Sequence, residues 1–405
     1  MVSPIVGLVS LLAAFGLQPA AAQNNQPNLT QALQSANSSL STLTGLIATQ
    51  NGTLELLNSL TDITILAPNN DALKTFLGNT SVSDISPEQI GAILSYHVLN
   101  GTYYSDNVTD TPSFLPTLLN ATEFTNVTGG QVVEAIKTDN NVTFLSGFRK
   151  QSNVTQANIT FTGGVIHIID EVLTIPLNLS ATAIEANLTA AAGALTAANL
   201  TEPLDQATNI TVFAPLNQGF ADIANILQNI SSEDLGNVLQ YHVLEGVVAY
   251  STDFQNGTLE TAGGETLNVT VLGSDVYVDS AKVVQPDVLI ANGVVHVIDR
   301  LENPSRLKIK LRANLDANSV LNPNATSGND TTPNTSTTAP AFSGASTLSN
   351  GAIPFTSGVP APTSTQTNLG GVASTSSSEQ AGARVTAMVG MGALFGGAAI
   401  LGNGF

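Results

Sequence analysis

Cysteine and tryptophan are absent from this 405-residue chain, and basic residues are scarce. The lack of cysteine excludes disulfide bonds, thiolate catalysis and cysteine-ligated zinc. Only 11 lysine and arginine residues accompany 30 acidic ones, which gives a formal net charge of −19. This charge predicts repulsion from nucleic acids and from anionic lipid surfaces. Aromatic residues make up 5% of the chain, so platforms for stacking against sugar rings are few.

Apolar residues are plentiful, and the length predicts more than one domain. An apolar run, "VGLVSLLAAFGL", starts at Val6 and is followed by small residues, which predicts a secretory signal peptide over residues 1–22. A second apolar run occupies residues 385–405 and follows small residues and a short polar spacer. This order predicts a glycosylphosphatidylinositol (GPI) signal whose tail is removed, with attachment at Ser376. A single-pass tail anchor is the alternative.

The sequon Asn-x-Ser/Thr occurs 21 times, and 18 of these sequons lie between Asn28 and Asn268. In a secreted chain, such a density predicts a surface shielded by glycans. The candidate acceptors are Asn51, Asn79, Asn107, Asn120, Asn126, Asn158, Asn187, Asn199, Asn229 and Asn256. Residues 322–384 are rich in serine, threonine and proline and lack hydrophobic periodicity, which predicts a disordered, O-glycosylated stalk.

Three sequence blocks occur twice in the same order, which identifies a duplicated domain. The pairs are "ITILAPNNDAL" from Ile63 and "ITVFAPLNQGF" from Ile210, "YHVL" from Tyr96 and from Tyr241, and "GGVIHIID" from Gly163 and "NGVVHVID" from Asn292. Upstream, "LSTLTGLI" from Leu40 resembles "LTAAAGAL" from Leu188. We therefore expect domains over residues 28–176 and 177–304. Domain one is longer between the second and third blocks, and we expect a hairpin or loop there, around residues 141–155.

Local signals predict the element ends. Asn70 and Asn217 are candidate N-caps after strands that stop at proline. The stretches "SPEQ" from Ser86 and "SSED" from Ser231 predict capped helices, and Gly101 and Gly246 are expected to end them. The runs "VIHIID" and "VVHVID" are apolar at successive positions, as in a central strand covered on both faces.

The three blocks together resemble the fasciclin domain family. The resemblance covers both domains and implies an α+β fold: two tandem fasciclin-like domains, each a mostly antiparallel β-wedge with a helical cluster. It also implies a role in adhesion at the cell surface or in the matrix. The signal peptide and the GPI signal, which were identified independently of the family, agree with that role.

All four histidines belong to the repeats: His97 and His242 follow Tyr96 and Tyr241, and His167 and His296 lie in the last strands. One interpretation is a metal site or acid–base pair in each domain. The other, which we favour, is a buried neutral imidazole that donates one hydrogen bond to a backbone carbonyl and accepts another. Two histidines without a third ligand make a poor zinc site, and no HExxH, G-x-S-x-G or phosphate-binding loop is present. We therefore expect no catalytic residues, cofactor or metal.

The stretch "QPDVL" from Gln285 enters the final strand pair of domain two. The fasciclin resemblance implies that an acidic-plus-aliphatic pair at this place binds adhesion receptors, and Asp287 with Val288 matches it, although Gln285 replaces the usual glutamate. Pro286 favours an extended or turn conformation that would present Asp287 at the strand edge. The alternative, which we favour, is that Asp287 only caps a turn. In domain one the aspartate's place is taken by Asn158, which opens a sequon, so a glycan would block contact there.

The sequence thus predicts a non-catalytic surface glycoprotein for adhesion or for organising the cell wall or matrix. The expected partners are surface, matrix or wall proteins or polysaccharides, with homophilic contact as an option, and attachment to the plasma membrane from outside through a GPI lipid. Nucleic acid is not expected as a partner. The alternative is an enzyme or carbohydrate-binding protein that acts on extracellular polysaccharide with paired carboxylates.

Overall fold

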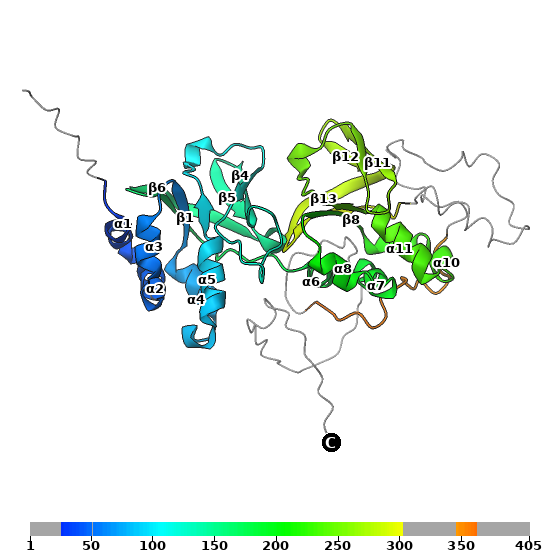
Figure 1. Ribbon diagram of the computed structural model, residues 1–405, viewed down its shortest axis with the longest axis horizontal. Coiled ribbons are helices and arrows are strands. Elements are labelled where there is room, and N and C mark those ends of the chain that lie inside the picture. The colour runs from blue at the N-terminus through cyan, green and yellow to red at the C-terminus, as the bar shows by residue number, and fades with distance from the viewer. Residues whose placement is uncertain (1–25, 51, 303–345, 363–405) are drawn as a thin grey trace, which may run out of the picture.

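The computed structural model describes residues 26–50, 52–302 and 346–362. The predicted signal peptide, the GPI tail, Ser376 and Asn51 lie outside these residues. Two domains lie side by side, each with one seven-stranded sheet and a set of helices against it (Figure 1). No helix within the described ranges is long and apolar enough to cross a membrane.

Domain one contains the first seven strands, in the spatial order β2-β1-β7-β6-β5-β4-β3. These strands are β1 (Ile63–Pro68), β2 (Val98–Asn100), β3 (Ser113–Pro116), β4 (Val132–Thr138), β5 (Asn141–Leu145), β6 (Gln151–Phe161) and β7 (Gly164–Ile169). Its helices are α1 (Leu29–Ser35), α2 (Asn37–Thr49), α3 (Thr53–Ser59), α4 (Asn70–Leu77) and α5 (Pro87–Tyr96), with short 3₁₀ turns η1 (Val82–Asp84), η2 (Ser105–Asn107) and η3 (Gly147–Arg149).

Domain two repeats this plan, in the spatial order β9-β8-β14-β13-β12-β11-β10. Its strands are β8 (Ile210–Pro215), β9 (Val243–Glu245), β10 (Gly257–Glu260), β11 (Thr266–Leu272), β12 (Asp275–Val278), β13 (Ala281–Ile290) and β14 (Gly293–Ile298). Its helices are α6 (Leu179–Glu185), α7 (Thr189–Ala197), α8 (Thr201–Gln206), α9 (Asn217–Ala221), α10 (Ala224–Leu227) and α11 (Ser232–Tyr241), with the 3₁₀ turn η4 (Ser251–Asp253).

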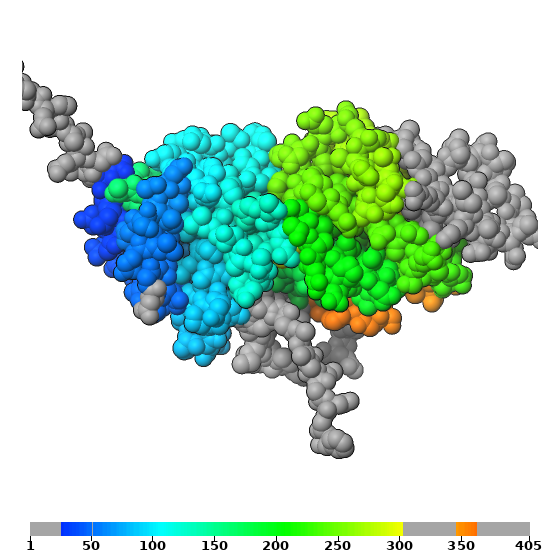
Figure 2. Space-filling view, in the orientation of Figure 1, coloured from blue at the N-terminus to red at the C-terminus, as the bar shows by residue number. Residues whose placement is uncertain are grey.

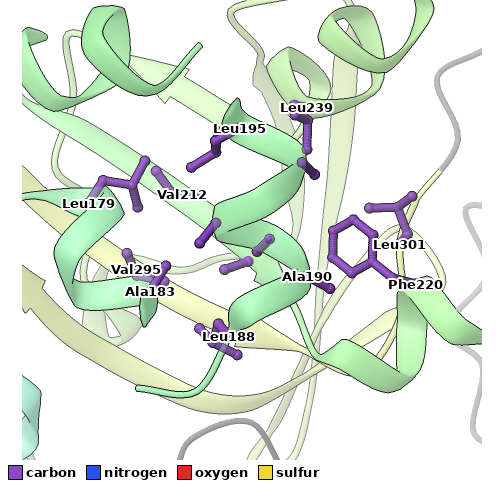
Figure 3. Packing of buried hydrophobic residues seen from close by; sticks show 14 of the residues in the cluster. Leu179, Ala183, Leu188, Ala190, Leu195, Val212, Phe220, Leu239, Val295 and Leu301 are labelled. Carbon is purple, nitrogen blue, oxygen red and sulfur yellow. The ribbon is translucent and has the colours of Figure 1, made fainter. Parts of the chain in front are cut away.

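Among the described strands the neighbouring pairs are antiparallel, except for β1 with β7 and β8 with β14, which are parallel. The predicted α+β class and the mostly antiparallel sheets are confirmed. Strands β7 and β14 lie in the middle of their sheets, and all six residues of β14 are buried. In domain two, aliphatic side chains of the helices pack against those of β8 and β14, including Val212 and Val295 (Figure 3).

The helix starts follow their capping signals, with one correction. Ser86 accepts from the Gln89 amide in a full capping box, and Ser231 accepts from the Asp234 amide. Asn70, however, is not the N-cap of α4, because Asn69 takes that place. The Asn70 side chain instead bonds Ser38 and Thr42 of α2.

Asn217 of domain two plays the same part as Asn70, since it does not cap α9 by its side chain either. Its side chain bonds Ala190 and Asn187 at the start of α7. The two asparagines therefore tie corresponding pairs of helices together, α2 with α4 and α7 with α9.

The glycine prediction is also corrected. Helices α5 and α11 end at His97 and His242, and a short strand follows each. Gly101 and Gly246, at φ 126° and 77°, end those strands and not the helices. A left-handed φ favours glycine at both places.

The extra length of domain one lies mostly elsewhere than predicted. The β3–β4 connection covers residues 117–131, whereas the matching β10–β11 connection covers 261–265. The β5–β6 connection covers residues 146–150, against 279–280 between β12 and β13. Residues 141–155 therefore hold only the smaller part of the insertion, and both longer connections face domain two.

The stalk prediction does not hold for residues 346–362. This segment lies along the helices of domain two (Figure 2). Ile353, Phe355 and Val359 pack against the hydrophobic core of that domain, and Ser346 exchanges two hydrogen bonds with Asn225. The rest of the predicted stalk lies outside the described residues.

Candidate functional site at the domain junction

Asp287 lies in a β-bulge of β13, and Asn158 lies in the matching bulge of β6. Both residues have a left-handed backbone, with φ 60° for Asp287 and 59° for Asn158. Aspartate and asparagine tolerate this conformation better than other residues with a side chain. The bulge also accommodates Pro286, which has no amide hydrogen for the ladder. The sequence difference between the two domains therefore leaves the backbone unchanged here.

Each bulge side chain holds a serine of a neighbouring 3₁₀ turn. Asp287 Oδ1 accepts from the Ser251 amide at 2.8 Å, and the Ser251 hydroxyl donates to Asp287 Oδ2. In domain one, Asn158 Oδ1 accepts from the Ser105 amide at 3.0 Å, and its Nδ2 donates to the Ser105 hydroxyl at 2.8 Å. The Asp287 carboxylate and the Asn158 amide thus each bond both the backbone amide and the hydroxyl of one serine.

The strand histidines lie beneath these bulges. His296 Nε2 donates to the Ala249 carbonyl at 2.8 Å, while its Nδ1 accepts from the Asp287 amide at 3.3 Å. His167 Nε2 donates to the Tyr103 carbonyl at 2.8 Å, and its Nδ1 accepts from the Asn158 amide at 3.3 Å. Each ring is therefore a neutral linker between two backbone segments.

His97 and His242, the histidines of the "YH" pairs, each link the end of a helix (α5 or α11) to the segment that follows the last strand of the sheet. His97 Nδ1 donates to the Ile93 carbonyl at 2.7 Å, and its Nε2 accepts from the Leu173 amide at 2.9 Å. His242 repeats this arrangement with the Val238 carbonyl and the Glu302 amide. All eight ring nitrogens of the four histidines thus have backbone partners.

The tyrosines of the same pairs are also buried. Tyr96 donates to the Val132 carbonyl at 3.0 Å, and Tyr241 donates to Asp279 Oδ2 at 2.5 Å. Burial raises the pKa of both phenols. These tyrosines therefore remain protonated and act as hydrogen-bond donors inside the fold.

Burial also sets the charge state of the histidines. It lowers the pKa of His97 and His242 to about 4 and lowers the pKa of His167 and His296 by desolvation of the charged form. Burial raises the pKa of Glu302 to about 8, although the Ser280 hydroxyl donates to this carboxyl group. The four histidines are accordingly neutral at pH 7. No group of three candidate ligands for a metal occurs within the described ranges.

The Asp287 bulge meets domain one at Arg149. The guanidinium of Arg149 binds both carboxylate oxygens of Glu134, at 2.8 and 3.3 Å. The same group also donates to the backbone carbonyls of Pro286 and Asp287, at 3.1 Å each. Burial raises the pKa of Glu134, which Arg149 opposes. The arginine thus neutralises a buried carboxylate of domain one and binds the backbone of domain two.

The longer β3–β4 connection supplies a second set of contacts across the junction. Gln131 Nε2 donates to the Ile290 carbonyl at 3.0 Å, and the Ala291 carbonyl accepts from Thr125 and Asn126. Thr128 and Asn209 exchange a reciprocal pair of 2.7 Å bonds, and the Asn126 side chain donates to the Gln206 carbonyl at 3.5 Å. Beside this connection, Phe114 of β3 stacks on Tyr250 with ring centroids 3.9 Å apart. The insertion of domain one therefore forms much of the junction.

The expected exposure of Asp287 is wrong. Asp287 is 2% exposed, because the bulge turns it toward Ser251 and Arg149 of domain one binds the backbone there. Val288 is 1% exposed, because it packs in the hydrophobic core of domain two. Sequence reasoning missed Arg149, Glu134 and Gln131. One signal was present: Arg149 is one of few basic residues and lies in a segment that domain two lacks.

The candidate sequons differ in accessibility. The exposed acceptors are Asn79, Asn107, Asn120, Asn199, Asn229 and Asn256. Asn126, Asn158 and Asn187 are only partly exposed. The amide nitrogen of Asn158, which would carry a glycan, donates to Ser105 within the fold.

Comparisons with known proteins agree with the internal repeat. The Fasciclin domain family model matches residues 38–176 and 186–302. The chain is 35% identical over 317 residues to a fasciclin-like arabinogalactan protein of Arthroderma benhamiae, covering 76% of this chain and 69% of that protein. It is 30% identical to the fasciclin-like arabinogalactan protein elcF of Phaeosphaeria nodorum, covering 69% and 89% of the two chains.

Two more distant similarities involve animal proteins. The chain is 27% identical to the transforming growth factor-beta-induced protein ig-h3 of Sus scrofa, over 60% of this chain and 35% of that protein. Among solved structures, a domain pair of the insect cell adhesion molecule fasciclin I matches 67% of this chain and 99% of its own, at 20% identity and a TM-score of 0.33.

Proposed function

Since this chain belongs to the fasciclin domain family, we propose that it is a non-catalytic glycoprotein of the cell surface that mediates adhesion or organises the wall or matrix. The observation that supports the non-catalytic part of the proposal is the use of all eight histidine ring nitrogens in backbone hydrogen bonds. These side chains would otherwise be the first candidates for acid–base catalysis or metal binding at neutral pH. Their contacts assign them to holding the fold.

The proposed attachment to the surface is supported by two apolar segments of the sequence. The signal peptide over residues 1–22 would direct the chain out of the cell, and the tail over 385–405 would be exchanged for a GPI lipid near Ser376. Phosphatidylinositol-specific phospholipase C should then release the protein from intact cells. Recovery of a peptide containing Phe405 from the mature protein would contradict a GPI anchor.

Adhesion is tested on the full secreted chain. Beads coated with the protein should aggregate or bind cells and wall material, and the same preparation should leave a panel of extracellular polysaccharides unhydrolysed. Turnover of any polysaccharide by the parent protein would favour the alternative, an enzyme with paired carboxylates. The relatives named fasciclin-like arabinogalactan proteins support a glycan-bearing surface protein.

We propose that the adhesion surface of domain two includes the strand that carries Asp287 and Val288. If Asp287 contacts a receptor, the junction must first open, because its side chain is buried and Arg149 binds the strand. Val288 packs in the core of domain two, so it would serve such a surface only by supporting the strand. An attachment assay that compares the parent with a variant whose junction is weakened distinguishes a hidden surface from an exposed one. Greater attachment after weakening would support the Asp287 surface.

A further inference from the structure

An apolar cavity of about 260 Å³ lies in domain one beside α2, α4 and α5. It is larger than the roughly 150 Å³ apolar cavities that accept benzene. Its lining contains no charged residue and consists of Thr42, Gly45, Leu46, Thr49, Leu73, Phe76, Leu77, Val82, Ile85, Ile90 and Ile93. We name this feature the α2 groove.

Gly45 lies within α2 and lines the α2 groove. A Cβ atom at this position would meet no atom within 4 Å, so contacts of a methyl group within domain one do not require glycine here. Glycine inside a helix costs about 1 kcal/mol relative to alanine. The open space leaves room for the backbone of another segment to approach α2 closely at Gly45.

The corresponding place in domain two is occupied. In the repeat, Gly45 corresponds to Gly193 of α7, and Leu73 corresponds to Phe220 of α9. A Cβ atom on Gly193 would collide with the carbonyl oxygen of Phe355, and it would lie 3.0 Å from a methyl group of Val359. The ring of Phe355 also packs edge-on against Phe220, with centroids 6.3 Å apart. Glycine at position 193 thus makes room for the segment 346–362.

The helices that bear these residues are fixed in the same way in both domains. Asn70 bonds α4 to α2, and Asn217 bonds α9 to α7. The segment in domain two carries no charged residue between Ser346 and Pro362, which suits an apolar surface. Figure 2 shows it in orange along the lower edge of domain two.

We propose that the α2 groove is a peptide-binding site. Its occupant is an uncharged segment of another protein chain that carries an aromatic side chain and, four residues later, an aliphatic one, as Phe355 and Val359 do. The occupant's backbone lies against Gly45, and its aromatic ring lies against Leu73. This proposal does not depend on the adhesive function.

The test uses the full chain and a synthetic peptide of residues 346–362 with a fluorescent label. Because the chain's own segment already fills domain two, the added peptide should bind the parent protein at one site, as measured by fluorescence anisotropy and by stoichiometric titration. Gly45→Leu should weaken binding at least tenfold by filling the groove. A peptide with Phe355→Ala should lose at least tenfold as well.

The matched control is Gly91→Leu, because Gly91 is an exposed glycine of α5 that also has no neighbour within 4 Å and does not line the groove. It should bind the peptide as the parent does, and circular dichroism should show both variants folded. No saturable binding to the parent, or equal binding by Gly45→Leu and Gly91→Leu, would overturn the proposal.

A variant of the full chain with Phe355→Ala separates the two domains. This change should vacate domain two, so the number of peptide sites should rise from one to two. If the peptide binds only this variant and never the parent, domain one has no such site and the proposal fails.

Discussion

Domain one and domain two build the same network from different residues at one position. Asn158 and Asp287 both have a left-handed backbone, both bond a serine, and both donate a hydrogen bond from the backbone amide to a histidine ring. One side chain, however, is a neutral amide and the other is a carboxylate. Only the aspartate lies under a neighbouring domain, where Arg149 binds the backbone beside it. The comparison teaches that the same hydrogen bonds to a serine and a histidine accompany the bulge in both domains. The exposure of the bulge residue depends instead on whether the neighbouring domain lies against it.

The contacts that domain one makes at the junction have no counterpart in domain two, and Arg149→Ala would remove the ion pair among them. Glu134 is 1% exposed, so the change would leave a buried carboxylate without its partner. We expect a loss of about 3 kcal/mol in the free energy of unfolding. Chemical denaturation measures it, and Glu134→Gln in the same chain should restore part of the loss. An unchanged midpoint for Arg149→Ala would contradict the role of the ion pair.

The strand histidines test how similar the two networks are. His167→Ala and His296→Ala should each lower stability by about 1–3 kcal/mol, because each leaves a buried backbone carbonyl and amide unpaired. Thermal melts of the two variants should give similar losses. A variant with an unchanged melting temperature but no attachment to cells would show that the histidine serves binding and not the fold.

Glu302 gives domain two a pH dependence of its own. The buried histidines have pKa values below their unfolded values, so their contribution is complete above about pH 6.5 and is lost as the pH falls toward 4. Glu302, whose pKa is raised to about 8, contributes most below pH 4.5 and loses that contribution as the pH rises to 8. The two effects oppose each other between pH 4.5 and 6.5.

Glu302→Gln removes the opposing contribution, and its amide can still accept from Ser280. The stability of the variant relative to the parent should then increase with pH between 4.5 and 8, by about 1.4 kcal/mol per pH unit at most. Above about pH 6.5 this difference arises because the parent loses stability while the variant does not. Denaturation at a series of pH values measures this slope. Parallel curves for the parent and Glu302→Gln would show that Glu302 is ionised in the folded protein.

The smallest effect is expected from Asp287→Asn, which gives domain two the residue of domain one. Because Asn158 satisfies Ser105 with its amide, Asn at position 287 can satisfy Ser251 in the same way. Stability should change by less than about 1 kcal/mol. The cell-attachment assay gives the second measurement: a folded Asp287→Asn protein that no longer attaches would assign the carboxylate to receptor binding.

The sequence alone determined the features that depend on neighbouring residues. The repeat, the central strands and the capping of α5 and α11 follow from short patterns, because a cap or a strand is stabilised by groups a few residues away or by the alternation of side chains. The choice of Asn70 over Asn69 as N-cap failed because both residues can cap, and only the packing of α2 against α4 gives Asn70 its other partners.

The tertiary structure alone decided what lies against what over long distances. The burial of Asp287, the bond from Arg149 to its carbonyl, and the packing of Phe355 on Phe220 join residues more than a hundred positions apart. Such contacts depend on how whole domains and segments pack, and short sequence patterns do not predict that packing. The domain insertion, which the sequence shows only as extra length, takes its role as the junction because its two loops project toward the strand that carries Asp287.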